Sequence, residues 1–147
     1  MVTPHLARIG YVSALVKPWS RGDLDAHLST WRRSNARRGI TGLLLYEAGS
    51  VFQLLEGFPE DVRALYEAIA RDGRHRFVAP LIDEPLARRD FGDWSMGYGR
   101  VAATDLAALP GLRPFLDPAF RYWHCSPEMA GALVRGFATG PWRRAIG

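Results

Sequence analysis

Two polar side chains, Tyr11 and Gln53, stand in segments whose pattern is otherwise that of buried strands. An unsatisfied buried amide costs on the order of 1 to 3 kcal/mol, so Gln53 needs hydrogen-bond partners. Strand alternation puts it on the same face as Val51 and Leu55. A phenol and an amide that meet there would form a chain of donors and acceptors, to which Asn35 could add a second amide. On these residues alone, the simpler interpretation is that Gln53 bonds to backbone and Asn35 caps a helix.

Hydrophobic periodicity predicts five strands and two helices in the first hundred residues. Alternation and short apolar runs place the strands at 6–14, 40–46, 51–55, 77–82 and 94–98, with a basic loop at 85–90. Helical stripes place one helix from the capping residue Ser20 or Asp23 to about residue 35, and another from Pro59 to Gly73. The order βαββαββ is that of a ferredoxin-like α+β fold with a fifth strand added to a mixed sheet. Its first and third strands are neighbours, and both helices cover one face.

The segment after Val101 is rich in alanine, proline and leucine. It predicts two helices, near 104–109 and 127–138, and is too short to fold alone. Because Phe52 and Leu54 make the other face of the sheet apolar, this segment is expected to cover that face. We therefore expect one domain at 1–100 and a helical cap at 101–147. The large aromatic side chains expected to be buried are Trp31, Tyr66, Phe91, Tyr122, Trp123 and Trp142.

Composition excludes several functional classes. The net charge of +4 and pI of about 9.7 would suit an anionic partner, but the arginines occur as scattered pairs, which indicates solvated faces and no nucleic-acid partner. No apolar run approaches the roughly 20 residues of a membrane span, and no signal peptide is recognisable. The single cysteine, Cys125, excludes an internal disulfide, and the histidines lack metal-ligand spacing. We expect a cytoplasmic protein with no metal and no membrane contact.

Several short stretches gain meaning from their joint order and spacing. They are Tyr11-Val12-Ser13, Asn35 with Gly39 to Tyr46, Phe52 to Gly57, Asp72-Gly73-Arg74-His75, and Phe91 with Trp94-Ser95-Met96. Together they resemble the BLUF family, sensors of blue light using flavin, over Leu6 to Gly97. The chain is most similar to the short stand-alone type.

This resemblance implies a flavin held between the two helices, above the sheet. FAD is expected, with FMN or riboflavin as alternatives. Tyr11 resembles the tyrosine that donates an electron to the excited flavin, and Gln53 the glutamine between that tyrosine and the ring. Asn35 resembles an amide that binds the carbonyl edge of the ring. Trp94 and Met96 resemble the last-strand pair that approaches Gln53.

Further positions are expected at the cofactor because of the same resemblance. They are Ser34, Asp72, Arg74 and His75, with Arg32 or Arg38 as candidates for the cofactor phosphates. Ser34 stands where relatives often carry asparagine or histidine, so its contact with the flavin would be shortened. Asp72 could equally cap the second helix, and His75 could be a surface or packing residue.

The implied photocycle turns over no substrate, so the chain is expected to be a photoreceptor and not an enzyme. Tyr11 supplies an electron and then a proton by way of Gln53, and recombination leaves Gln53 rearranged. An amide in a dry pocket can switch in this way because it has two different donor patterns. With no cyclase, phosphodiesterase or DNA-binding segment, the signal is expected to reach a separate effector protein, by contact or by a change of homo-oligomer.

Two other classes stay open. A small ferredoxin-like enzyme or ligand-binding module could use Asp72 and His75 as acid and base, although no nucleophile elbow, phosphate loop or carboxylate pair supports it. An RNA-binding module of similar topology would present aromatic and basic side chains on its central strands. Residues 52–56 instead include an acid and no basic residue.

Overall fold

One mixed sheet, with its strands in the order β4-β1-β3-β2-β5, forms the centre of the molecule. The computed structural model describes residues 5–100, 103–109 and 111–147. The strands are β1 (Leu6–Leu15), β2 (Thr41–Glu47), β3 (Ser50–Gly57), β4 (His75–Leu86) and β5 (Gly97–Tyr98). All pairings are antiparallel except that of β5 with β2. The ferredoxin-like arrangement is confirmed, with β1 beside β3 and one strand added at the β2 edge.

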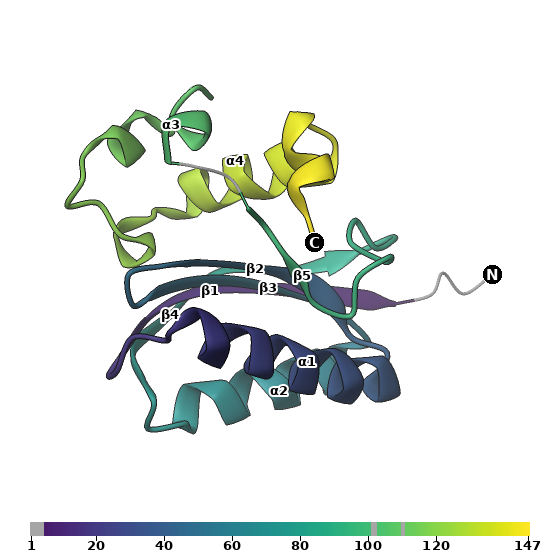
Figure 1. Cartoon of the computed structure of the whole chain (residues 1–147). Helices are drawn as coiled ribbons and strands as arrows, with labels where there is room; N and C mark the ends of the chain where they lie inside the picture. Colours follow the sequence, from purple (N-terminus) through teal and green to yellow (C-terminus); the bar gives the residue numbers. More distant parts are fainter. Residues whose placement is uncertain (1–4, 101–102, 110) are drawn as a thin grey trace.

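Two helices, α1 (Arg21–Arg38) and α2 (Pro59–Arg71), cover one face of the sheet (Figure 1). Ser20 and Asp23 both serve as the cap of α1, because each side chain accepts a hydrogen bond from the backbone N–H of the other. At the other end of α1, Gly39 adopts a φ of 67°, a left-handed conformation that favours glycine. No helix in the described part of the chain has the length and apolar character needed to cross a membrane.

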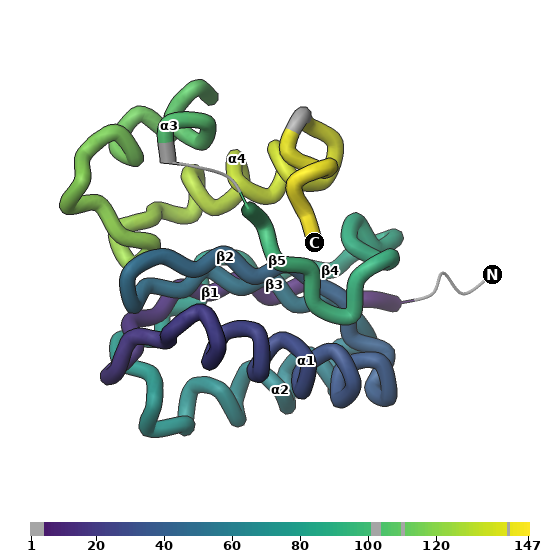
Figure 2. Tube along the Cα trace, in the orientation of Figure 1, coloured from purple at the N-terminus to yellow at the C-terminus, as the bar shows by residue number. Residues whose placement is uncertain are grey.

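The tail after residue 102 lies on the opposite face of the sheet, as expected (Figure 1). Its elements are α3 (Ala103–Leu106), η1 (Arg113–Leu116), η2 (Tyr122–His124), α4 (Pro127–Ala138) and η3 (Pro141–Ala145), the η elements being 3₁₀ turns. The chain then returns to the sheet, and its last residues lie beside β5 (Figure 2).

Strand alternation divides the interior into two cores. The core under the helices contains Ile9, Tyr11, Leu24, Leu28, Leu44, Leu55, Val62 and Met96. The core under the tail contains Val12, Leu43, Phe52, Leu54, Phe91, Leu133, Phe137 and Trp142. Of the aromatic side chains expected to be buried, Phe91, Tyr122 and Trp142 are buried, Trp31 and Tyr66 are half-buried, and Trp123 is 39 % exposed.

Several expected boundaries were wrong. β4 continues to Leu86 because it pairs with β1 along its whole length, so it takes in the start of the expected 85–90 loop. Its prolines are tolerated because β4 is an edge strand. The expected strand at 94–98 is reduced to Gly97–Tyr98, since the N–H of Trp94 donates to the Phe91 carbonyl in a turn at 3.1 Å. α1 runs three residues further than expected, α2 ends before Gly73, and α3 is shorter than 104–109.

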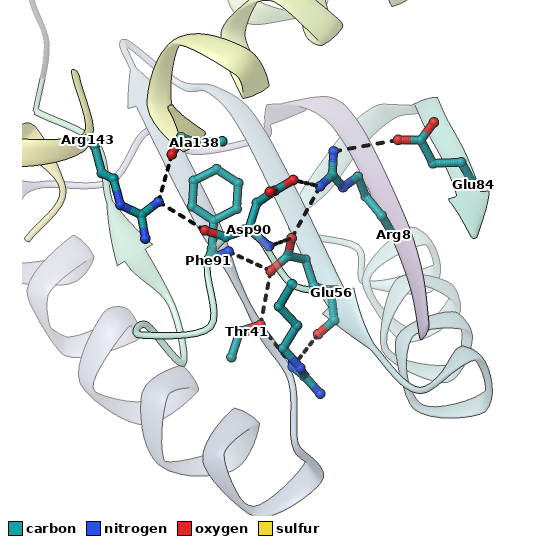
Figure 3. Close-up of polar contacts among 9 residues, drawn as sticks. Arg8, Thr41, Glu56, Glu84, Asp90, Phe91, Ala138 and Arg143 are labelled. Atoms are coloured by element: carbon teal, nitrogen blue, oxygen red, sulfur yellow. Dashed lines mark hydrogen bonds and ion pairs between the residues drawn. The ribbon is translucent and has the colours of Figure 1, made fainter. Parts of the chain in front are cut away.

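A buried carboxylate, Glu56 at the end of β3, ties the turn before β5 to the sheet (Figure 3). It accepts hydrogen bonds from the backbone N–H groups of Asp90 and Phe91, both at 2.9 Å, and from the Thr41 hydroxyl at 3.2 Å. Arg8 approaches Glu56 at 3.4 Å and also pairs with Asp90 and, at 3.6 Å, with Glu84. The carboxylate therefore satisfies donors from three separate segments of the chain.

We expect Glu56→Gln to lower the free energy of unfolding by about 3 kcal/mol, because the new NH₂ group faces donors and Arg8 loses its buried counter-charge. Urea denaturation measures this. Glu84→Gln is the matched control: it makes the same change at another partner of Arg8, but its side chain is 52 % exposed, so the loss should stay below about 1 kcal/mol. Equal losses in the two variants would contradict a special role for Glu56.

Candidate functional site

A narrow slot lies between α1, α2 and the sheet. It is lined by Tyr11, Trp19, Trp31, Asn35, Leu44, Val51, Gln53, Leu65, Ile69, Asp72, Arg74 and His75. The space not filled by atoms is about 460 Å³, part of it open to solvent. The slot thus combines apolar and aromatic walls with two buried amides, a combination that suits a flat, partly polar ligand.

Tyr11, Gln53 and Met96 meet on the sheet side of this slot, and we call these three residues the relay. Tyr11 and Gln53 are directly opposite each other in the β1–β3 register. The Tyr11 hydroxyl donates to Gln53 Oε1, and Gln53 Nε2 donates to the Met96 sulfur at 3.4 Å. The exposed fractions of the three residues are 1 %, 5 % and 0 %, so the relay is dry. The expected meeting of Tyr11 and Gln53 on the helix side of the sheet is confirmed.

Burial keeps the Tyr11 phenol protonated. It raises the pKa of the Tyr11 phenol far above its ordinary value, and the charges of Tyr66 and Asp72 raise it further. The phenol therefore stays protonated, and its hydroxyl donates to Gln53 Oε1. The amide NH₂ then faces Met96, whose thioether is a weak acceptor.

Asn35 lines the slot from α1 and connects it to the turn before β5. Its Nδ2 donates to the Ser95 carbonyl at 2.8 Å, and the residue is 4 % exposed. The neighbouring Ser34 is half-buried and does not line the slot, because it lies on a different side of α1. Ser34 is therefore not brought to the candidate site.

Asp72, Arg74 and His75 line the slot just beyond α2. The Arg74 side chain and backbone N–H both donate to the Asp72 carboxylate, which lowers the pKa of Asp72 to about 2. His75 Nδ1 lies 2.9 Å from the Ser13 hydroxyl, and desolvation lowers the pKa of His75. Asp72 is also the C-terminal cap residue of α2, so it both lines the slot and ends the helix.

Trp94 does not reach the relay, contrary to expectation. It packs in the tail-side core against Phe91, and the Arg143 guanidinium lies over its ring at 4.9 Å. The turn that begins at Phe91 rotates Trp94 to the opposite side of the sheet from Met96. Met96, and not Trp94, is thus the neighbour of Gln53 in this structure.

The two arginines considered for cofactor phosphates are placed elsewhere. Arg38 is exposed and does not line the slot. Arg32 donates to two backbone carbonyls, those of Met96 and Gly147. Neither arginine is among the residues that line the slot.

Six wall residues were not foreseen as parts of the site: four are aliphatic, and two, Trp19 and Trp31, are aromatic. Trp19, just before α1, tilts against Trp31 and Tyr46 at centroid distances of 5.6 and 5.2 Å. Trp31 was expected in the core because of its helical spacing, but it lines the slot. An aromatic residue directly before a helix cap is a sequence signal that could have indicated Trp19, since side chains there often pack back onto the helix. Among the described residues, no group of three or more His, Cys, Asp or Glu side chains could hold a metal ion.

A buried phenol–amide pair beside a slot between two helices, on a ferredoxin-like sheet, is the arrangement of a ligand-binding domain. Comparisons with known proteins identify its family. The model of the BLUF family, described as sensors of blue-light using FAD, matches residues 6–97. A solved dark-state structure of BlrB, a BLUF protein, is 30 % identical with a TM-score of 0.72, over 93 % of this chain and 98 % of that one. The chain belongs to the BLUF family of blue-light sensors.

Two curated relatives are considerably longer than this chain. The photoactivated adenylate cyclase subunit beta of Euglena gracilis is 37 % identical over 115 residues, which are 76 % of this chain and 13 % of the relative. The blue light- and temperature-regulated antirepressor BluF of Escherichia coli (strain K12) is 36 % identical over 73 residues, 50 % of this chain and 18 % of the relative. The chain therefore spans only a small part of each of these relatives.

We expect the free energy of unfolding to fall above pH 10, because Tyr11 and Tyr122 stay protonated when folded and ionise when unfolded. Their raised pKa values contribute stability that is fully present below pH 10 and lost above it. Each such tyrosine contributes about 1.4 kcal/mol per pH unit to the slope. Urea denaturation from pH 9 to pH 11 should show a shallower decline for Tyr11→Phe and for Tyr122→Phe. A wild-type slope in Tyr11→Phe would show that its phenol ionises normally in the folded protein.

Proposed function

We propose that the relay of Tyr11, Gln53 and Met96 is the photoactive centre of this blue-light sensor, with FAD bound non-covalently in the slot. The observation that supports it most is the dry hydrogen-bonded sequence from the Tyr11 hydroxyl through the Gln53 amide to the Met96 sulfur. Tyr11 is the electron donor in this proposal, and Gln53 is the switch. The remaining slot residues hold and orient the ligand.

The slot suits a flavin chemically. The amides of Asn35 and Gln53 are positioned to bind the polar edge of the ring, while Leu65 and Ile69 of α2 offer apolar contact to its faces. Arg74 is an arginine among the slot residues, although Asp72 already pairs with it. When bound, the flavin supplies absorption of blue light and an acceptor for one electron. The family description names FAD, and FMN or riboflavin would use the same slot residues.

The chain's own part of the reaction is a reversible transfer from Tyr11. The phenol gives up an electron, and its proton moves from the hydroxyl to Gln53 Oε1, the atom that already accepts its hydrogen bond. Electron and proton then return to Tyr11, so no net chemistry remains. What persists is a rearranged Gln53 amide, which no longer donates to Met96 in the same way. Because the site excludes water, this arrangement is not quickly erased by solvent.

A separate effector protein would receive the signal. Relatives with names that include an adenylate cyclase and an antirepressor indicate that BLUF sensors act on varied outputs, and this chain spans only 13 % and 18 % of those two. We infer that the tail, residues 101–147, is a cap of the sensor and the surface that meets an effector or a second copy of the chain. The lone cysteine, Cys125, is buried, which accords with a cytoplasmic location.

The purified protein should be yellow and should show a small, reversible red shift of its flavin absorption under blue light. Tyr11→Phe and Gln53→Leu should each abolish the shift while flavin stays bound. Tyr66→Phe is the matched control. The Tyr66 ring packs edge-on against the Tyr11 ring, with 5.7 Å between the ring centroids, but its phenol is outside the relay. A normal photocycle in Tyr11→Phe or Gln53→Leu would refute the assigned roles.

Asn35→Ala should lower flavin occupancy several-fold, because the variant loses an amide at the slot and the contact with Ser95. The ratio of flavin to protein absorbance measures this, with Ser34→Ala as the control beside it. Chromatography of the flavin released by denaturation identifies the cofactor, and FAD is expected. Unchanged occupancy in Asn35→Ala would remove Asn35 from the binding site.

A further inference from the structure

Arg32 makes two hydrogen bonds that the sensing function described above leaves unexplained. From the middle of α1, its Nε donates to the Met96 carbonyl at 2.8 Å, and one terminal nitrogen donates to the Gly147 carbonyl oxygen at 2.6 Å. Met96 is fully buried, and its sulfur accepts from Gln53. One guanidinium therefore bonds to the backbone of a relay residue and to the far end of the tail.

The segment Ala145–Gly147 is docked beside β5, with an isolated antiparallel bridge between Gly99 and Ile146. Tyr98 and Gly147 exchange both backbone hydrogen bonds, at 3.0 and 2.9 Å, and the Arg100 N–H donates to the Ala145 carbonyl at 3.0 Å. A side chain at Gly97 would prevent this docking, because its Cβ would lie 2.4 Å from an Ile146 methyl. The docked segment thus depends on a few backbone bonds, a close approach at Gly97 and the contact with Arg32.

We propose that Arg32 is a positioning residue that couples the relay to the docking of Ala145–Gly147; the proposal rests on the proposed function. In the dark, Arg32 holds the Met96 carbonyl and the Gly147 carbonyl at a fixed distance from each other. When the Gln53 amide rearranges, its bond to the Met96 sulfur is lost and Met96 is free to shift. If Arg32 then follows the Met96 carbonyl, it withdraws from the Gly147 carbonyl, and the docked segment is weakened.

An arginine suits this position because of the shape of its side chain. The planar guanidinium carries several N–H donors in a rigid fork, so two carbonyls bound to different nitrogens are held at a fixed spacing. A lysine ammonium is a point donor on a flexible stem and cannot impose that spacing. Arg33, next in sequence, is exposed and so provides a control with the same charge.

The test compares wild type, Arg32→Gln, Arg32→Lys and Arg33→Gln by absorption and by amide hydrogen exchange, in the dark and under blue light. In wild type, light should raise exchange at the Arg100 and Gly147 amides. In Arg32→Gln, dark exchange at Gly147 should already be about tenfold faster than in wild type and should no longer respond to light, while the red shift persists. Arg32→Lys should fall between the two, and Arg33→Gln should behave as wild type.

The outcomes separate the inference from the function on which it rests. A normal red shift with a wild-type, light-dependent exchange pattern in Arg32→Gln would overturn the inference alone. So would a wild-type red shift without any change of exchange at residues 98–100 and 145–147. Absence of a red shift in the wild type would overturn the proposed function, and the inference with it.

Discussion

The sensor depends on one amide that can find its partners only inside the protein. Gln53 is nearly fully buried, and its two ends have unlike neighbours: a phenol that must donate and a thioether that accepts weakly. A half turn of the amide would bring its NH₂ to Tyr11 and its oxygen to a sulfur that has no hydrogen to give. The observed orientation is thus favoured by the chain itself, and the other becomes stable only where a further donor is supplied. Such an asymmetric pair of states is the basis of a switch.

Much of the remaining structure brings Met96 to that amide. β5 is a short strand, paired with β2 at Gly97–Tyr98, and the segment before it bonds to β2 where the Gly42 N–H donates to the Trp94 carbonyl at 3.1 Å, so strand pairing alone holds this segment weakly. It is held instead by polar contacts from two sides, with Glu56 binding the start of the turn and Asn35 binding the carbonyl before Met96. Removing either contact would loosen the relay without touching its members.

The sequence was sufficient to predict the facing pair, because alternation and ferredoxin-like strand order together place Tyr11 opposite Gln53. It could not place Trp94 and Met96 correctly. Residues two apart on a strand share a face, and only the turn beginning at Phe91 sends them to opposite sides. The contacts of Glu56 and Arg32 join segments far apart along the chain, and nothing local in the sequence indicates which donor a buried acid or which carbonyl an arginine will meet.

The sheet is a single layer, so β3 presents Gln53 to one core and Phe52 and Leu54 to the other. The sheet therefore separates the helix-side core from the tail-side core. The segment that covers the tail side of the sheet needs only to match the apolar surface that Phe52 and Leu54 form there. Different tail structures could therefore replace one another on this face during evolution while the slot stayed unchanged. This freedom suits a sensor module found in chains of very different length.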